Sequence, residues 1–365
     1  MSTELLNAKI KNFSYQKCLR KELENHIFID INDLPSSSIV SFSGKEFALS
    51  KWVSPKRTRS YPYARVYDTF DCDVSKVVTI IPIIKDEGSS GDMDYLQWDT
   101  LSLMSLLNVY VILAFYDKAE IHRIKQNKIT NQKFHNGYIK QELEKLCNYH
   151  QSALHWNLNQ LKQENLSLLI ESAKQSYTNI SRSLGCTLHN PQNIDKFVTK
   201  ITQSKDSFME FSRSKAKMAQ NREIHTTQSK EFIGIGKKTK IMIQNYLGGQ
   251  YFFTIDDVLF KDKCLYLCES KHSKNTILPS EDDIKDGLLK LMLYNNIDSI
   301  QGYKNFKVVL RLTSNILQDS IALPNNNLEL FLNSNPFSPK EKQMLLYLNL
   351  ESNKNHFSVW INYDL

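Results

Sequence analysis

The sequence predicts a mixed α/β protein with more than one domain. Two apolar runs, at residues 77–84 and 109–115, have the length and composition of buried strands, and a helical pattern joins them over residues 95–107. A second succession of helix-like and strand-like segments begins near residue 238. The 365 residues also exceed the length of one ordinary domain, so two or three units are expected.

The composition excludes several classes of protein. Apolar residues make up 41% of the chain and charged residues 23%, as in folded globular proteins and unlike disordered or collagen-like chains. The longest apolar run, residues 101–115, is shorter than the roughly 18–20 residues of a membrane-spanning helix. We expect no membrane segment and no export signal, and therefore six free cysteine thiols in the cytoplasm.

Residues 1–130 are predicted to form an N-terminal α/β module. Its expected elements are strands at residues 63–67, 77–84 and 109–115 and a helix at residues 95–107. Basic residues alternate with Trp and Tyr between Lys51 and Tyr67, a pattern that suits phosphates and unstacked bases, although the aromatic rings could equally pack on the sheet. The DNA contacts predicted in this module are Lys56, Arg57, Arg59 and Arg65.

An acidic cluster lies between the strand and the helix of this module. Its members are Asp86, Glu87, Asp92, Asp94 and Asp99. Carboxylates so close in sequence could hold a hard cation, but an acidic loop at a helix N-terminus is the favoured interpretation.

Residues 131–232 are predicted to form a helical region. Apolar residues recur at steps of three and four between Leu143 and Leu161, which predicts one long amphipathic helix, and a second helical run covers residues 193–218. Basic residues outnumber acidic ones between Arg213 and Lys240, in a strip that suits a phosphate backbone but is also typical of a solvated surface. Residues 234–239 are not a nucleotide-binding loop, because Lys238 separates Gly-Lys from the following Thr.

Residues 233–365 are predicted to form a compact mixed domain. The expected order is a helix at 238–247, strands at 251–260 and 264–270 joined by a tight turn, a helix at 284–294 and a strand at 307–313. Ser280 and the acidic residues after it are a good N-terminal cap for the helix at 284–294. A helix at 340–350 and a strand at 356–363 complete the domain.

The apolar hairpin of this domain contains charged residues. If the turn consists of Asp262 and Lys263, Asp256 lies opposite Glu269, with β-carbons about 4.5–5.5 Å apart; a three-residue turn would put Ile255 there instead. Two facing carboxylates repel unless a cation lies between them, and oxygen ligands favour Mg²⁺ or Mn²⁺. The predicted ligands are Asp256, Glu269 and the carbonyl of Ser270, with Asp257 as an alternative to Asp256.

The segments Ile255-Asp-Asp-Val-Leu-Phe260 and Leu267-Cys-Glu-Ser-Lys271 resemble the PD-(D/E)XK nuclease superfamily, which includes type II restriction endonucleases. The similar region is about 75 residues long, from Lys238 to Thr313. The resemblance implies a restriction-endonuclease-like core of a helix, three strands, a helix and a strand. It also implies hydrolysis of phosphodiester bonds, with Asp256 and Glu269 as metal ligands and Lys271 as the catalytic lysine.

Two features depart from the family pattern. No proline precedes Asp256; Ile255 stands there, as an isoleucine does in many members of the family. The helix expected at 238–247 has no convincing carboxylate, although some members have one in the preceding helix. The N-terminal module repeats the order of elements faintly but lacks a Glu-X-Lys motif, so it is expected to be a recognition or degenerate module.

The function expected from these residues and from the resemblance is that of a Mg²⁺-dependent DNA endonuclease of the type II restriction class. Additional contacts to the DNA backbone are expected from Lys237, Lys238, Lys240, His272 and Lys274. The net charge of +7 permits such an anionic partner. A homodimer and a cognate DNA methyltransferase are the other partners expected. A non-specific repair or defence nuclease and a non-catalytic nucleic-acid-binding protein are the alternatives.

Overall fold

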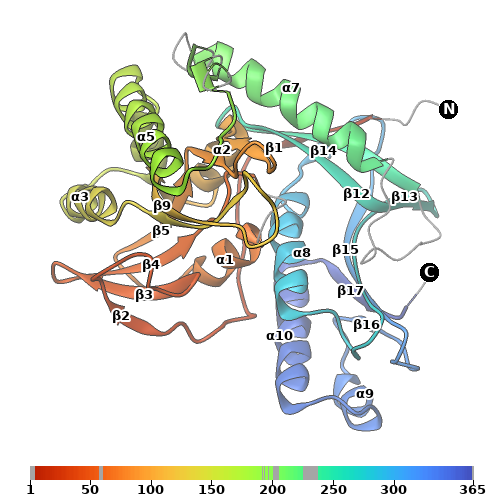
Figure 1. Ribbon diagram of the computed structural model, residues 1–365. Helices are drawn as coiled ribbons and strands as arrows, with labels where there is room; N and C mark the ends of the chain where they lie inside the picture. The colour runs from red at the N-terminus through yellow and green to blue at the C-terminus, as the bar shows by residue number, and fades with distance from the viewer. Residues whose placement is uncertain are drawn as a thin grey trace. The chain divides into compact units, whose positions relative to one another are not determined.

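The computed structural model describes residues 5–56, 61–190, 192, 194–195, 197–199, 205–224 and 237–363. It is a mixed α/β protein, as predicted (Figure 1). The chain forms two compact units and not the three expected regions 1–130, 131–232 and 233–365. We call residues 23–214 the inserted unit, and residues up to 22 together with residues 215–365 the C-terminal unit.

The inserted unit is built on a five-stranded sheet. The strand order is β2-β3-β4-β5-β8, with β3 antiparallel to β4 and with β4, β5 and β8 parallel. Helix α1 (Pro62–Thr69) connects β4 to β5, and α2 (Trp98–Leu106) lies between β5 and β8 in the chain. The bounds of the strands are Asn25–Ile27 (β2), Ser37–Phe42 (β3), Lys45–Lys51 (β4), Lys76–Pro82 (β5) and Tyr110–Ala114 (β8).

The strand predicted at residues 63–67 is wrong, because these residues belong to α1. Pro62 occupies the first turn of this helix, where its missing N–H costs no hydrogen bond. The aromatic side chains of the segment therefore follow helical spacing, and Tyr63 and Tyr67 are buried. Their packing agrees with the alternative interpretation of the basic and aromatic stretch.

The helices of the middle region belong to the core of the inserted unit. The predicted long helix is interrupted at residues 148–152, where Ser152 caps a new helix by accepting from the His155 N–H. Leu143, Leu146 and Trp156 pack with Phe47 and Leu49 of the sheet, which explains why this region is not a separate domain. The helices are α3 (Asn136–Cys147), α4 (Ala153–Gln160) and α5 (Gln163–Leu184).

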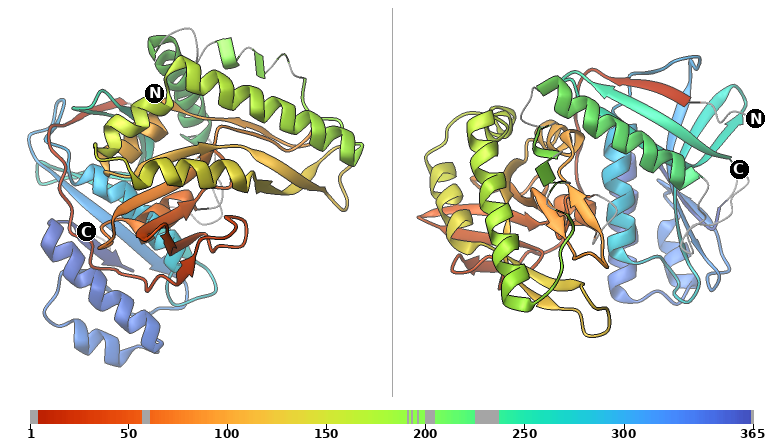
Figure 2. Two further views of the ribbon diagram at one scale, coloured as in Figure 1. Left: turned by 90° about the vertical axis from the view of Figure 1, so that its left-hand side faces the viewer. Right: turned by 45° about the horizontal axis from the view of Figure 1, so that its top comes forward.

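Two hairpins complete the inserted unit. Strands β9 (Tyr116–Ile121) and β10 (Ile129–Phe134) pair antiparallel, and α5 runs along them (Figure 2). Strands β6 (Ile84–Asp86) and β7 (Met93–Tyr95) form a short second pair directly after β5.

The C-terminal unit is built on an eight-stranded sheet with the order β14-β1-β11-β12-β13-β15-β17-β16. Strand β1 comes from the start of the chain and pairs parallel with β11. Helix α8 (Glu281–Tyr294) packs on β13 and β15, and α10 (Pro339–Asn355) packs on β16 and β17 (Figure 1). The strand bounds are Leu5–Ile10 (β1), Lys237–Asn245 (β11), Gln250–Lys261 (β12), Cys264–Ser273 (β13), Ser299–Ile300 (β14), Phe306–Ser314 (β15), Ile321–Leu323 (β16) and Ser358–Ile361 (β17). The other helices are α7 (Lys205–Ile224), which the boundary between the units crosses, and α9 (Leu328–Ser334).

The helix predicted at residues 238–247 is wrong, because this segment is strand β11. Ile241 and Ile243 are fully buried and alternate with the more exposed Lys240, Met242 and Gln244, which suits a strand with one face in the core. Pairing with β1 on one side and β12 on the other fixes the extended form. The predicted helix at 284–294 and the strands at 251–260, 264–270 and 307–313 are confirmed as α8, β12, β13 and β15.

The two units share one arrangement of elements. In each, an antiparallel hairpin is followed by a helix and then by a strand parallel to the second hairpin strand: β3, β4, α1 and β5 in the inserted unit, and β12, β13, α8 and β15 in the C-terminal unit. Both hairpins turn through two residues with positive φ, Ser43-Gly44 and Asp262-Lys263. The repetition predicted in the N-terminal module, which began with a strand at residues 63–67, is wrong because these residues are helical; the repeated order lies instead in β3, β4, α1 and β5.

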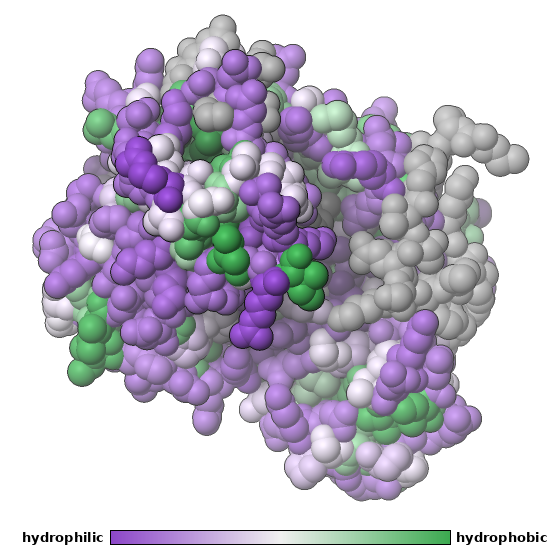
Figure 3. Space-filling model, in the orientation of Figure 1, coloured by the Kyte–Doolittle hydropathy of each residue, from purple (hydrophilic) through white to green (hydrophobic). Residues whose placement is uncertain are grey.

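On the face drawn in Figure 3, apolar side chains lie in small separate groups among polar ones. Within the described ranges, no helix is long and apolar enough to span a membrane.

Candidate functional site

The register of the β12–β13 hairpin brings the predicted site residues together. Lys261 pairs with Cys264 and Asp257 pairs with Cys268, which is the register of the two-residue turn. The next pair in this register is Asp256 with Glu269. The Ser270 N–H donates to Asp256 Oδ2 at 3.0 Å, which ties the end of β13 to this carboxylate.

A β-bulge lies at the two neighbouring aspartates. The β11–β12 ladder shifts register between the pairs Thr239–Ile255 and Lys237–Val258, so that Asp256 and Asp257 together lie opposite one residue of β11. Bulges redirect side chains next to many active sites. Here Asp256 is directed to Glu269, whereas Asp257 takes other partners.

Asp257 is engaged by other side chains, so Asp256 is the candidate metal ligand. Arg311 Nη1 on β15 lies 3.2 Å from Asp257 Oδ2, and the Ser270 hydroxyl donates to the same oxygen at 3.3 Å. Both charged side chains are almost fully buried. The structure thus distinguishes the two aspartates that the sequence left open: Asp257 forms a buried ion pair, and Asp256 lies with Glu269.

Glu269 is the centre of the site and is fully buried. Its Oε1 atom lies 2.6 Å from Lys290 Nζ and 3.1 Å from Lys271 Nζ. Its Oε2 atom is buried and has no hydrogen-bond partner among the described residues. A buried carboxylate oxygen without a donor is costly, so this atom is suited to a ligand.

Lys271 lies on the same side of the hairpin as Glu269, as predicted. Its Nζ atom also contacts Asp286 Oδ2 of α8 at 3.0 Å. Burial alone would lower the pKa of Lys271, but Asp286 and Glu269 outweigh burial and raise this pKa above its ordinary value. Lys271 is therefore a fixed cation in this structure.

The pKa of Asp256 is also raised, but for a carboxyl group this shift disfavours the charged form. Burial of the carboxyl group and the charge of Glu269 raise the pKa of Asp256 to about 7, while Lys290, Lys271 and the Ser270 N–H act in the other direction. A carboxyl group with so high a pKa beside a second carboxylate indicates a place where an added cation would be favourable.

Helix α8 supplies two residues that the sequence analysis missed. Asp286 and Lys290 are four residues apart, which places them on one helix face, and they contact Lys271 and Glu269 respectively. Their spacing was visible in the sequence, but nothing local indicated which face of α8 packs on β13. We call Asp256, Glu269, Lys271, Asp286 and Lys290 the hairpin site.

Helix α7 places a further carboxylate near the hairpin site. Glu223 accepts from the Thr254 hydroxyl at 3.2 Å, and its charge contributes to raising the pKa of Lys290. No such carboxylate was expected from the sequence, because residues 238–247 were predicted to form the preceding helix. With that segment a strand, the preceding helix is α7.

The protein groups of the hairpin site supply only part of the ligand shell of a hard cation. Within the part of the chain that the structure describes, no set of three or more His, Cys, Asp or Glu side chains is arranged to hold a metal. Mg²⁺ commonly uses one or two carboxylates and completes its shell with water or phosphate oxygens. Asp256 and Glu269, with the unsatisfied Oε2 atom of Glu269, match that smaller requirement.

Two of the predicted DNA contacts lie close to the hairpin site. His272 follows Lys271 on β13 and its Nδ1 atom lies 2.9 Å from the Thr313 hydroxyl, while Lys274 is exposed. Lys240 Nζ donates to Asn221 Oδ1 at 2.6 Å, and Lys238 Nζ contacts the carbonyl of Glu223 at 3.5 Å. Lys237 begins β11, but its side chain is outside the described part.

The predicted contacts of the inserted unit have internal partners where they are described. Lys56 forms an ion pair with Asp94, and Arg65 Nη1 donates to the Lys51 carbonyl at 2.7 Å. Arg57 and Arg59 lie outside the described residues.

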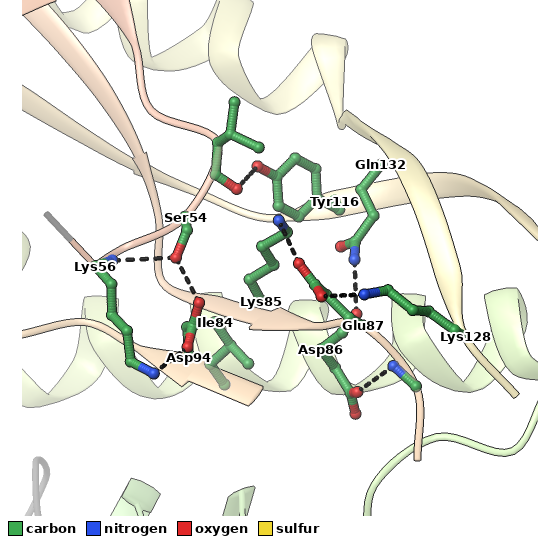
Figure 4. Close-up of polar contacts among 12 residues, drawn as sticks. Ser54, Lys56, Ile84, Lys85, Asp86, Glu87, Asp94, Tyr116, Lys128 and Gln132 are labelled. Carbon is green, nitrogen blue, oxygen red and sulfur yellow. Dashed lines mark hydrogen bonds and ion pairs between the residues drawn. The ribbon is translucent and has the colours of Figure 1, made fainter. Parts of the chain in front are cut away.

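Four members of the acidic cluster, Asp86, Glu87, Asp94 and Asp99, are buried, whereas Asp92 is exposed. Lysine side chains form ion pairs with Glu87 and Asp94 (Figure 4). Asp94 accepts from the Ser54 hydroxyl at 2.7 Å and pairs with Lys56. Asp99 alone lies in the first turn of α2. The predicted role of the cluster as a helix cap therefore applies only to Asp99.

The other two buried carboxylates of the cluster, Asp86 and Glu87, lie at the end of β6 and form contacts within the inserted unit. Glu87 lies 2.9 Å from Lys85 Nζ and 3.1 Å from Lys128 Nζ (Figure 4). Asp86 accepts from the Gly88 N–H at 2.8 Å and contacts His189 Nδ1 at 2.7 Å. The chain itself thus supplies partners for these carboxylates, which favours a structural role.

Comparison of the chain with protein-family models, with curated proteins and with solved structures gave no significant match.

Proposed function

We propose that this protein is a metal-dependent DNA endonuclease that hydrolyses phosphodiester bonds at the hairpin site. The observation that carries the proposal is the meeting of Asp256, Glu269 and Lys271 at one end of the hairpin, with a buried Glu269 oxygen that has no hydrogen-bond partner among the described residues. Paired carboxylates beside a lysine suit metal-assisted attack on a phosphodiester.

The order of elements supports the PD-(D/E)XK resemblance on which the proposal draws. Helix α7, strands β11, β12 and β13, helix α8 and strand β15 follow one another along the chain. This is a helix, three strands, a helix and a strand, with β13 and β15 parallel. The three residues of the motif occupy the second and third of these strands.

The chain's own groups have distinct parts in the proposed reaction. Asp256, Glu269 and the Ser270 carbonyl would hold Mg²⁺ or Mn²⁺, which supplies a Lewis acid and an activated water when bound. The raised pKa of Lys271 keeps its ammonium protonated near neutral pH. Lys271 is therefore better suited to neutralise charge that develops on the phosphate than to remove a proton from water.

More specifically, we propose that the protein is a type II restriction endonuclease. DNA would be contacted near the hairpin site by Lys238, Lys240, His272 and Lys274, and the net charge of +7 favours a polyanion. The inserted unit adds 192 residues, from 23 to 214, to the unit with the hairpin site, and sequence-reading enzymes need such additional surface. A homodimer would place two sites on two strands, and a cognate methyltransferase would protect the host DNA.

A cleavage assay tests this proposal directly. Purified protein is incubated with plasmid and genomic DNA in Mg²⁺, with EDTA as the control. Discrete fragments that EDTA abolishes are expected. A smear abolished by EDTA would contradict sequence specificity and favour a repair or defence nuclease. Metal-independent DNA binding without cleavage would contradict the catalytic proposal.

A further inference from the structure

Lys290 occupies the hairpin site in a way that the predicted catalytic motif does not require. Its side chain extends from α8 and is only 13% exposed, and its Nζ atom lies 2.6 Å from Glu269 Oε1. Lys271 contacts the same oxygen at the longer distance of 3.1 Å. The nearest positive charge to the central carboxylate therefore comes from the helix and not from the motif.

The backbone of α8 lies directly against the two motif side chains. A Cβ atom on Gly287 would be 3.3 Å from Lys271 Cε and 3.5 Å from Glu269 Cγ. Gly287 is flanked by Asp286, which contacts Lys271, and is one turn before Lys290. This close approach of the helix backbone brings Lys290 within reach of Glu269.

We propose that Lys290 is an internal counter-ion, which neutralises Glu269 in the metal-free protein and is displaced from Glu269 when a divalent cation binds. The inference rests on the proposed function, since it concerns the same site. A metal ion at Glu269 and an ammonium group 2.6 Å from its Oε1 atom repel each other, so each weakens the binding of the other. Lys290 is thus a positioning residue that sets the metal affinity.

The surroundings of Lys290 provide a place for the displaced ammonium group. Asp256, Asp286 and Glu223 all contribute to its negative environment, in addition to Glu269. Asp286 is one helical turn away on the same face of α8. A change of side-chain rotamer can therefore move the charge from Glu269 to Asp286 without moving the helix.

Calorimetric titration with Mn²⁺ alone tests the inference without DNA. The variant Lys290→Met is expected to bind Mn²⁺ about tenfold more tightly than the wild type, because antagonism between two cations is lost. Lys290→Arg retains the charge and is expected to bind Mn²⁺ within about threefold of the wild type. Lys285→Met is the matched control, because Lys285 is a buried lysine of the same helix that pairs with Glu281.

The outcomes separate this inference from the proposed function. If the wild type binds no Mn²⁺, the proposed function fails. If the wild type binds Mn²⁺ and Lys290→Met binds it equally or more weakly, only the inference fails. An equal increase in Mn²⁺ affinity in Lys285→Met would also overturn the inference, because the effect would then reflect the overall charge of α8.

Thermal unfolding provides a second readout that does not require a fully stable variant. In EDTA, Lys290→Met is expected to unfold at a lower temperature than the wild type, because Glu269 loses its nearest counter-charge. Mn²⁺ is expected to raise its unfolding temperature by more than it raises that of the wild type. An equal or smaller rise would contradict the counter-ion role.

Discussion

Two fully buried glutamates show how burial alone fails to identify a functional residue. Glu351 Oε1 accepts from the Tyr15 hydroxyl at 2.6 Å, and its Oε2 accepts from the N–H groups of Cys18 and Leu19 at 2.8 and 2.7 Å. Both oxygens of Glu351 are thus satisfied by the chain itself. Glu269 has two lysines on one oxygen and no hydrogen bond within the described structure on the other, which indicates an external partner.

Lys271→Met is expected to lower the rate of DNA cleavage by roughly 100-fold or more, because the phosphate loses its fixed cation. Mn²⁺ binding to this variant should be no weaker than in the wild type, since Lys271 is not a metal ligand. Single-turnover cleavage and calorimetry measure the two effects. Cleavage at the wild-type rate would contradict the role given to Lys271.

Glu351→Ala is expected to lower the free energy of unfolding by about 3 kcal/mol, because the part-buried N–H group of Cys18 and the buried N–H group of Leu19 lose a charged acceptor. Denaturant unfolding measures the change. The affinity for Mn²⁺ should be unaltered in the folded variant. A shift in Mn²⁺ affinity would show that the two buried glutamates are not independent.

The pH dependence of stability has one clear contribution from Glu281. Burial alone would raise its pKa, but hydrogen bonds from Lys285 and Lys340 lower the pKa of Glu281 to about 2. Because the folded-state pKa is depressed, the stabilisation is present above the ordinary pKa near 4.5 and is lost as the pH falls through about 2.

Glu281→Gln should therefore be less stable than the wild type at about pH 6, with a difference that shrinks toward pH 2. Thermal unfolding at several pH values measures this difference. A difference that grows as the pH falls would contradict the assignment.

Local sequence signals predicted the hairpin and the helix that form the site. The alternation of apolar residues, the Asp262-Lys263 turn and the Ser280 cap each depend on neighbours in sequence, and each is confirmed. The segment at β11 was misjudged because its extended form depends on pairing with β1, more than 200 residues away in the chain.

The difference between local signals and contacts between distant segments also explains which site residues could be found from the sequence. Asp256, Glu269 and Lys271 are related by hairpin arithmetic, so the sequence placed them on one face. Asp286 and Lys290 reach the site only through the packing of α8 on β13. No local pattern specifies that packing.

Gly287→Ala tests the close approach of α8 to the site. The new Cβ would be 2.9 Å from Leu310 Cδ1 and 3.3 Å from Lys271 Cε, so these flexible side chains must move. Alanine gains about 1 kcal/mol of helix propensity over glycine, so stability should change little while cleavage falls about tenfold. Gly137→Ala is the control, because its nearest contact would be His135 Cε1 at 3.4 Å. Cleavage lowered equally in both variants would contradict the prediction.

Both units contain the repeated arrangement of elements, but among the described residues the hairpin site belongs to the C-terminal unit. Counting from the two-residue turns, Ser37 and Ser50 of the inserted unit correspond to Asp256 and Glu269, and Trp52 corresponds to Lys271. The corresponding residues face the following helix in both units, since the Ser37 hydroxyl contacts Asp68 of α1 and Trp52 packs on Tyr63.

The inserted unit therefore has the arrangement without the carboxylates. We expect the chain to have one catalytic centre, in the C-terminal unit. The inserted unit does contain another buried glutamate with two lysine partners, Glu87, which makes it a matched control for Glu269.

The most direct measurement is the rate of plasmid cleavage in Mg²⁺ by Glu269→Gln and Glu87→Gln, each compared with the wild type. Both substitutions preserve shape and remove one buried charge, and circular dichroism verifies that each variant is folded. We expect Glu269→Gln to cleave at least 100-fold more slowly and Glu87→Gln to remain within about threefold of the wild type. Cleavage retained in Glu269→Gln and lost in Glu87→Gln would contradict the assignment of the active site to the hairpin.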